Sequence, residues 1–344
     1  MYLETARNLN GTATSITCKL GDGHTLWSDM IRENVVMLAG NEHMSVVATA
    51  DGALYFFSKH GRRLLPAVIL SAQVAHLQVL GAPANALRAH VVVITSDGML
   101  RAWDASALQE TCSISLASLL RDVHGAPSGA LVERVWLSSA GLPVVAMSSG
   151  NCYAYHPGMK VMMRIADDHF QASSLSSLSS LTSQRSQPSS VALPVGPLTR
   201  AIEVAKRNFK PQTLPGIISM DDDQQSQQTI AHAETCLASA IVLESRDEFK
   251  HWLSCYSRLL VDSIREGENG FGEARLRELC EYIYPPSLMT SGASGAGTAD
   301  TRPERKILGH VRTKLLEDLI RLMRTNRGLQ RVVAEFELYA RPQA

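Results

Sequence analysis

Histidine and cysteine are the residues of this chain best suited to metal binding or nucleophilic catalysis, and their spacing favours neither. No C-x-x-C pair occurs, and no two histidines flank a glutamate at i and i+4, so a helical zinc site is not indicated. The six cysteines are typical of buried thiols in a reducing compartment. They are Cys18, Cys112, Cys152, Cys236, Cys255 and Cys280. The sequence therefore predicts no metal site and no disulfide framework.

Motifs for phosphate binding and acyl transfer are incomplete. Gly21-Asp22-Gly23 begins like a dinucleotide fingerprint, but Leu26 occupies the position of the third glycine. There is no Gly-Lys-Ser/Thr loop and no Gly-x-Ser-x-Gly elbow. His251, beside Trp252, fits a base or ligand but equally fits an ordinary helical residue. We expect no enzyme and no cofactor; an enzyme with an unfamiliar site remains an alternative.

The sequence has one strongly basic segment, although its net charge is zero. The 344 residues carry 33 Lys plus Arg against 33 Asp plus Glu, which excludes a polyanion binder that works through net charge. The stretch 301–331 has a local excess of Arg and Lys that fits DNA phosphates or an acidic partner, and it also fits a solvated helix face. The candidate contact residues are Arg312, Lys314, Arg321 and Arg324.

The elements that would position such residues begin with an internal repeat. Segments 46–57, 91–104 and 144–155 each join an apolar strand, a turn ending in Gly, and a strand with an aromatic residue. Their turn glycines, Gly52, Gly98 and Gly150, recur about every 50 residues, which is typical of a propeller blade. Asp-Gly at two of these turns predicts a type I′ turn, with positive φ at both central residues.

Three repeats plus part of a fourth are too few for the commonest closed propellers. The segments 16–20 and 35–38 read as further strands of the partial repeat. Trp103 and Asp104 stand where a WD dipeptide would close a blade, and that position is structural in a closed ring. In an open β-structure, unpaired edges recruit partners, so we take both residues as candidate interface residues.

The composition changes after the repeats. A Ser-, Pro- and Gln-rich stretch predicts a flexible linker, with a short helix over 199–208. We therefore divide the chain into a β-blade region over 1–168, a linker over 169–228 and a helical region over 229–344. No apolar run approaches the ~18–20 residues of a membrane span, so we expect no membrane partner.

Helical periodicity marks the last third. Apolar residues recur at three- and four-residue spacing from Phe249 to Ile264, and Ser245 with Glu248 predicts a capping box before them. Further helices are expected over 230–243, 273–284, 304–323 and 329–339. A helix with such a wide apolar face needs a partner surface. Phe249, Trp252 and Tyr256 are therefore additional interface candidates.

The helical third contains a run, from Ala240 to Val261, that resembles the C-terminal domain of the HIRA histone chaperone family. The segments 276–280 and 315–319, with 61–66 and 100–104 in the β half, resemble the same domain in the same order. The resemblance implies mainly β, WD-like hairpin repeats followed by an α-helical region. The resemblance does not include the family's N-terminal WD propeller, so we expect this sequence to correspond to the C-terminal part of a family member.

The resemblance also implies a function. It implies a nuclear subunit of a complex that deposits histones H3–H4 independently of replication and represses histone genes. It implies self-association, with a trimer favoured, and docking of a calcineurin-binding-protein-like helical-repeat subunit, while histone contact is indirect. The alternative, from the residues alone, is a nucleic-acid binder that uses the basic segment 301–331.

Overall fold

The computed structural model describes residues 2–7, 13–80, 89–121, 131–138, 140–167, 169–170, 173–175, 194–208, 222–264, 271–285 and 306–340. The chain divides into two compact units, Met1–Arg164 and Ile165–Ala344. The finer division into three segments stays a prediction. Most of the serine-rich tract and the whole of 292–297, expected as linker and loop, lie outside the described residues.

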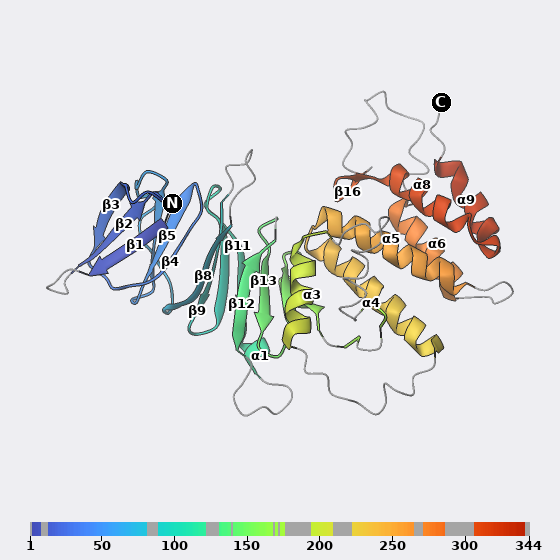
Figure 1. The fold of residues 1–344 in the computed structure, drawn as a ribbon, viewed down its shortest axis with the longest axis horizontal. Coiled ribbons are helices and arrows are strands. Elements are labelled where there is room, and N and C mark those ends of the chain that lie inside the picture. The colour runs from blue at the N-terminus through green and yellow to red at the C-terminus, as the bar shows by residue number, and fades with distance from the viewer. Residues whose placement is uncertain are drawn as a thin grey trace, which may run out of the picture. The chain divides into compact units, whose positions relative to one another are not determined.

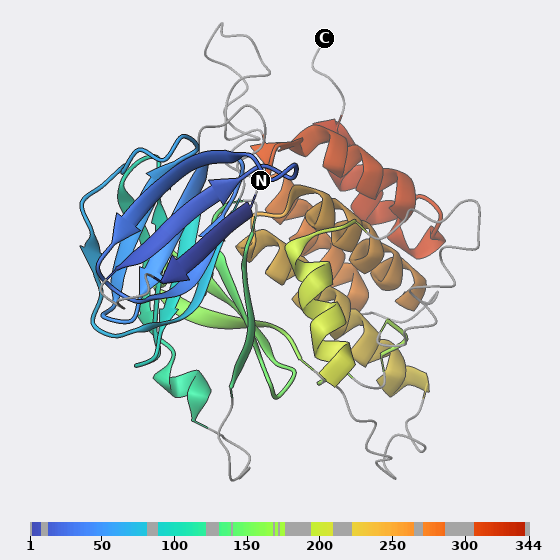
Figure 2. The same ribbon diagram turned by 60° about the vertical axis from the view of Figure 1, so that its left-hand side comes forward.

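The N-terminal unit is built from four antiparallel sheets, which confirms the expected repeat. The first sheet contains β1–β3, the second β4–β7, the third β8–β11 and the fourth β12–β15. Figure 1 shows them side by side in chain order, with the first and fourth at opposite ends of the row. The described strands therefore do not close into a ring. Figure 2 brings the first sheet, in dark blue, to the front.

The strands have these bounds: β1 Tyr2–Arg7, β2 Thr14–Lys19, β3 Thr25–Ile31, β4 Val35–Gly40, β5 Met44–Thr49, β6 Ala53–Ser58, β7 Val68–Ile69, β8 Val74–Leu80, β9 His90–Thr95, β10 Met99–Asp104, β11 Gln109–Ser115, β12 Val132–Leu137, β13 Pro143–Met147, β14 Cys152–His156 and β15 Val161–Ala166. A short helix, α1 (Ala117–Leu120), follows β11.

Apolar cores lie between successive sheets, and strand alternation builds them. In β5, Val46 packs into the core shared with the third sheet, whereas Val47 packs into the core shared with the first. In β9, Val91 faces the second sheet and Val92 faces the fourth. Because side chains alternate across a strand, a sheet covered on both faces needs apolar residues at successive positions. This explains the continuous apolar runs of the repeat.

The hairpin turns differ in type from the expected one. Gly52, Gly98 and Gly150 have φ of +79°, +82° and +89°, but Asp51 and Asp97 do not have positive φ. The N–H of each of these glycines bonds to the carbonyl three residues earlier. This is a type I turn followed by a left-handed glycine, the usual three-residue hairpin. The type I′ prediction was therefore wrong, although the glycines were placed correctly.

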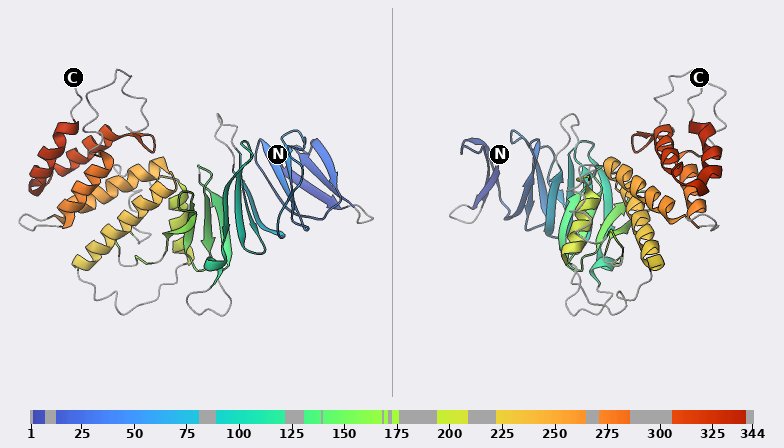
Figure 3. Two further views of the ribbon diagram at one scale, coloured as in Figure 1. Left: turned by 180° about the vertical axis from the view of Figure 1, so that it is seen from behind. Right: turned by 45° about the vertical axis from the view of Figure 1, so that its right-hand side comes forward.

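The C-terminal unit is helical. It contains α3 (Pro197–Asn208), α4 (Asp222–Val242), α5 (Arg246–Ser263), α6 (Phe271–Ile283), α8 (Arg312–Met323) and α9 (Gln330–Ala340), with a 3-10 turn, η3 (Arg327–Leu329), before α9. The helices α4 and α5 lie side by side, while α6 and α8 pack against α5 (Figure 3). No helix of the described ranges has both the length and the apolar character needed to cross a membrane.

One expected helix starts later than its pattern suggests. The range 304–311 was expected to be helical, but β16 (Lys306–Ile307) and β17 (His310–Val311) form a small hairpin before α8. Leu308 and Gly309, at its tip, have φ of +46° and +80°. Two consecutive left-handed residues cannot continue a right-handed helix. The helix therefore begins only at Arg312.

Candidate interaction surfaces

The WD dipeptide ends β10, which pairs with β9 on one side and β11 on the other. Trp103 follows a β-bulge at Ala102 and packs, half-buried, against the core between the second and third sheets. The Asp104 carboxylate accepts hydrogen bonds from the backbone N–H groups of Ser106 (2.9 Å) and Ala107 (3.1 Å). Both residues thus have structural contacts within one copy. Their contact with a partner stays a prediction.

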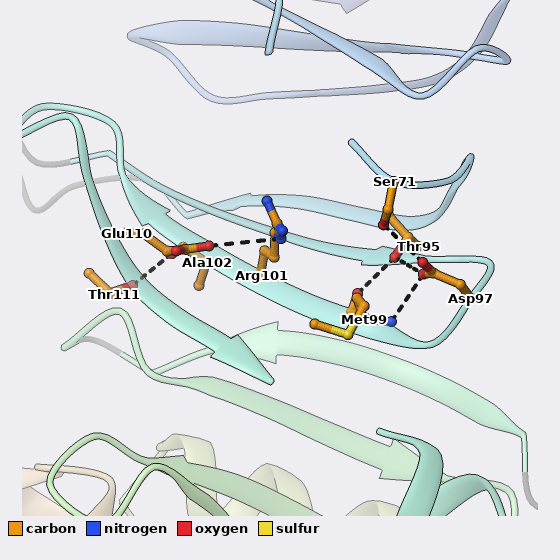
Figure 4. A network of polar contacts seen from close by, with 8 residues as sticks. All are labelled: Ser71, Thr95, Asp97, Met99, Arg101, Ala102, Glu110 and Thr111. Atoms are coloured by element: carbon orange, nitrogen blue, oxygen red, sulfur yellow. Dashed lines mark hydrogen bonds and ion pairs between the residues drawn. The ribbon is translucent and has the colours of Figure 1, made fainter. Parts of the chain in front are cut away.

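A polar network at the other end of the third sheet is equally structural (Figure 4). The Asp97 carboxylate accepts hydrogen bonds from the Thr95 hydroxyl, from Ser71 Oγ at 2.8 Å and from the Met99 N–H at 3.3 Å. The Thr95 bond, followed by the Ser71 bond, lowers the pKa of Asp97. The network ties the turn of β9 and β10 to the segment that leads into β8. Its acceptors stabilise the fold.

The aromatic interface candidates of α5 lie inside the C-terminal unit. Phe249, Trp252 and Tyr256 are 0%, 3% and 5% exposed. The expected partner surface for the apolar helix face is therefore found within the chain, in α4, α6 and α8. In a single copy these three side chains offer almost no surface to another subunit.

Glu248 is the residue whose role the sequence did not indicate. It is fully buried, and its carboxylate accepts hydrogen bonds from the N–H groups of Leu198 (3.1 Å) and Thr199 (2.6 Å), at the start of α3. The capping-box prediction was wrong, because Ser245 makes no side-chain cap and Glu248 caps a different helix. A carboxylate at a helix N-terminus satisfies orphan N–H groups and matches the helix dipole.

The sequence carries a signal for only one side of this contact, at the start of α3. Gly196 precedes α3 and has no side chain that could cap the helix, so the acceptor has to come from elsewhere. A Cβ added to Gly196 would lie 2.2 Å from the Glu248 carboxyl carbon. The glycine is thus required for the close approach of the two segments. Nothing in the sequence identifies Glu248, about 50 residues away, as the partner.

The four basic candidates are mostly engaged within the unit. Arg312 donates from Nη1 to the carbonyls of Tyr282 (2.9 Å) and Ile283 (2.7 Å), which end α6. Burial lowers the pKa of Arg312. Arg321 lies 3.8 Å from an Asp318 carboxylate oxygen, and Arg324 donates twice to Glu337 Oε1, at 2.8 and 3.1 Å. Lys314 is exposed. The four therefore do not form one free cationic surface.

A half-buried histidine lies in α4. His232 of α4 stacks on Phe170, with ring centroids 5.0 Å apart, and its Nδ1 lies 3.0 Å from Ser173 Oγ. Burial, assisted by the Lys206 cation, lowers the pKa of His232 to about 4. The ring is therefore neutral at physiological pH. No group of three His, Cys, Asp or Glu side chains placed to hold a metal occurs in the described ranges. All six cysteines are free thiols, and all but Cys255 are buried.

The outer face of the first sheet carries three exposed apolar side chains. Tyr2 pairs with Lys19 and Met30 pairs with Ser15, on the side opposite the core-facing Ile16. Tyr2, Leu26 and Met30 are 42%, 40% and 52% exposed. Lys19 Nζ forms an ion pair with Glu4 at 2.6 Å on the same face. Thr17 and Ser28 pair on this face as well, so it mixes exposed apolar side chains with polar ones.

Comparison with known proteins matches this chain along nearly its whole length. It is 32% identical to Protein HIRA of Oryza sativa over 94% of this chain and 31% of the rice protein. It is 28% identical to Protein HIRA of Xenopus laevis over 90% of this chain and 28% of that protein. The chain thus spans about a third of the length of the curated relatives it matches.

A solved structure shows the same fold. The crystal structure of HIRA(644-1017) matches with a TM-score of 0.66 and 24% identity, over 98% of this chain and 91% of that one. The arrangement of sheets followed by helices is thus shared. The family model described as Hira, TUP1-like enhancer of split, matches residues 61–283, which is more than half of the chain. By that match, this chain belongs to the Hira family.

Proposed function

We propose that this chain is a non-enzymatic part of a nuclear histone chaperone complex, one that deposits H3–H4 independently of replication and represses histone genes. The observation that carries the proposal is the extent of the family likeness, which includes 94% of this chain in the comparison with the rice protein. The chain acts through assembly: it self-associates, with a trimer favoured, and docks a calcineurin-binding-protein-like helical-repeat subunit. Its link to H3–H4 is indirect.

The exposed face of the first sheet supports self-association. Tyr2, Leu26 and Met30 lie there without a covering sheet in a single copy. Burial of apolar surface drives most protein association, and a stable contact buries more than about 1,000 Å² in total. Trp103 and Asp104 remain the second candidate, on the half-buried end of β10.

Native mass spectrometry of the purified chain at micromolar concentration tests the assembly. The expected result is a trimer. Trp103→Ala is expected to raise the ratio of smaller species to trimer at least threefold. Thermal unfolding of this variant checks that the fold persists, because Trp103 also packs against a core. A clean monomer of the unaltered chain contradicts self-association.

The chromatin role needs a second experiment. The tagged chain, recovered from nuclear extract, is expected to bring down the helical-repeat subunit together with H3–H4. Loss of the histones on depletion of that subunit is expected, because histone contact is indirect. Recovery of purified H3–H4 by the chain alone, or of neither partner from extract, contradicts this part of the proposal.

The nucleic-acid alternative receives no support from the geometry. Arg312 and Arg324 already donate hydrogen bonds to carbonyl or carboxylate oxygens, and Arg321 lies 3.8 Å from an Asp318 carboxylate oxygen. Binding through phosphates would weaken steeply with salt. We expect no salt-sensitive shift of duplex DNA at low ionic strength, measured by electrophoretic mobility.

A further inference from the structure

A groove lies between two neighbouring helices of the C-terminal unit, α5 and α8. It has a volume of about 390 Å³, which leaves room for several side chains of another element. Its apolar lining consists of four leucines: Leu253 from α5, and Leu315, Leu319 and Leu322 from α8. The first three are 6%, 4% and 4% exposed, whereas Leu322 is only partly buried. A groove with an apolar base between two packed helices is a surface on which a third helix can pack.

The polar lining of this groove is mainly basic. Lys250 and Arg258 of α5 and Arg321 of α8 are exposed cations, and Asp318 is the single carboxylate among the described residues that line it. Neither Lys250 nor Arg258 forms an ion pair or a side-chain hydrogen bond with any residue that the structure describes. Arg321 and Asp318 are 3.8 Å apart, but their side chains are 79% and 56% exposed, so the pair is weak. The positive charge of the groove is therefore largely uncompensated.

The spacing of the cations matches a helix. Lys250 and Arg258 are eight residues apart on α5, which is about two turns or ~12 Å along the helix axis. A helix that lies along α5 has the same rise, so acidic residues seven or eight positions apart on it can meet both cations. Arg321 lines the groove from the opposite helix and faces the other flank of such a guest helix. The lining thus fits an apolar stripe with acidic residues on both flanks.

This sequence does not supply an acidic occupant of its own. Its described helices bury their apolar faces within the unit, as α6 does with Leu276 and Ile283. The four longer segments of this unit outside the described residues contain five acidic and five basic residues in total, so together they carry no net negative charge. They are 176–193, 209–221, 265–270 and 286–305. Nucleic acid fits less well, because phosphates gain nothing from an apolar base and are repelled by Asp318. Charge complementarity therefore favours an acidic segment of a partner protein.

We propose that the groove between α5 and α8 binds an acidic amphipathic helix of a partner protein. The guest helix packs its apolar stripe on the four leucines and places carboxylates beside Lys250, Arg258 and Arg321, as in other helix-in-groove complexes. Burial of apolar surface supplies affinity, and the three cations select an acidic guest. This site goes beyond the proposed function, because it requires neither histones nor a trimer.

A designed peptide tests the site directly. The peptide is about 18 residues long, enough to form a helix, with leucine at i, i+4, i+7 and i+11, glutamate on both flanks of this stripe and alanine elsewhere. It carries a fluorophore and is titrated into the full chain at low ionic strength, where saturable binding by anisotropy is expected. The same peptide with glutamine in place of glutamate is expected to bind at least tenfold more weakly, because the cations then lose their partners. A scrambled peptide of the original composition has no apolar stripe, and at least tenfold weaker binding is expected for it as well.

Charge-reversal variants of the chain locate the binding. Lys250→Glu and Arg258→Glu are each expected to weaken binding of the glutamate peptide at least fivefold. Arg331→Glu makes the same change of charge at an exposed position of α9 outside the groove, and binding within twofold of the unaltered chain is expected. Leu322→Gln removes apolar contact from the groove and is expected to weaken binding at least fivefold. If circular dichroism shows that Leu322→Gln does not fold, the variants at the exposed cations and the three peptides still decide the question.

Any of four results would exclude the site. The first is no saturable binding of the glutamate peptide by the unaltered chain. The second is equal binding of the glutamate and glutamine peptides, and the third is equal weakening by Arg258→Glu and Arg331→Glu, which indicates a general charge effect. The fourth is peptide affinity that falls as the concentration of the chain rises, because a second copy then fills the groove. None of these readouts uses histones or the mass of the assembly, so the site can fail while the proposed function stands.

Discussion

Glu248 shows how one side chain can hold two distant segments together. Its carboxylate is buried in α5 and accepts from two N–H groups that open α3. Hydrogen bonds to a charged acceptor are stronger than neutral ones, and the N–H groups left without an acceptor after its removal are costly when buried. The carboxylate therefore organises the start of α3 as well as the interior of the unit.

Glu248→Ala is expected to lower the free energy of unfolding of the C-terminal unit by about 2–4 kcal/mol. Glu248→Gln keeps one acceptor oxygen and is expected to lower the free energy of unfolding by less than Glu248→Ala does. Asp247→Ala, at the exposed neighbouring position, is expected to cost less than about 1 kcal/mol. Urea denaturation gives the energies, and faster amide exchange in α3 shows the site of the loss. Equal effects of the Glu248 and Asp247 variants would contradict the assigned role.

His232 makes the stability of the same unit depend on pH. Its pKa in the folded chain is lowered from 6.5 to about 4, mainly by burial. On acidification, the unfolded chain binds a proton at this histidine near pH 6.5, and the folded chain does so only near pH 4. The contribution of His232 to the free energy of unfolding is thus fully present above pH 6.5. Up to about 3 kcal/mol of it is lost as the pH falls to 4.

Chemical denaturation at pH 7 and pH 5 checks this dependence. His232→Gln is expected to reduce the loss of unfolding free energy between the two pH values. Some dependence should remain, because burial also lowers the pKa of His251 in the same unit, with the same sign. An unchanged difference between pH 7 and pH 5 in the variant would exclude His232 as a source.

At the scale of elements, two helices of the C-terminal unit have their last carbonyls bonded by side chains from distant segments. Arg312, the first residue of α8, bonds to the last carbonyls of α6. Asn326 donates to the carbonyls of Val261 and Ile264 at the end of α5, at 2.9 and 3.0 Å. Orphan carbonyls at helix ends need such donors, and a cation also matches the helix dipole.

Arg312→Ala is expected to lower the free energy of unfolding of the C-terminal unit by about 1–3 kcal/mol, since two carbonyls lose a charged donor. Lys314→Ala removes an exposed cation two residues further along α8. This variant is expected to change the free energy of unfolding by less than about 0.5 kcal/mol. Urea denaturation of both variants measures the difference. Similar effects would mean that Arg312 acts only as a surface charge.

For the whole molecule, the decisive feature is the row of sheets with two ends. Sheets inside the row are covered on both faces, whereas the first sheet has its outer face exposed. A closed propeller removes such ends by joining its last blade to its first. An open row leaves apolar surface that a partner or a further copy can cover.

Met30→Glu is expected to lower the mass of the assembled species in light scattering, because it places a charge on the outer face of the first sheet. Met159→Glu is the matched control: Met159 is 62% exposed and lies between β14 and β15, away from that face. No change in mass is expected for it. An assembly that tolerates Met30→Glu would place the contact elsewhere, for instance at Trp103.

Local patterns were enough to predict much of this protein. Turn glycines, alternating apolar residues and three- to four-residue periodicity act through neighbours in the chain, so Gly52, Gly98 and Gly150 and the helix from Arg246 were found without coordinates. The family resemblance added the order of sheets and helices. The β-blade repeat and the helical C-terminal region were confirmed for these reasons.

Tertiary structure alone decided which residues meet. The Glu248 cap of α3 and the Arg312 cap of α6 join positions about 50 and 30 residues apart, and no local spacing encodes such pairs. It also showed that Phe249, Trp252 and Tyr256 face inward. The physical reason is that burial and hydrogen-bond partners depend on distances in space, whereas a single sequence reports only distances along the chain.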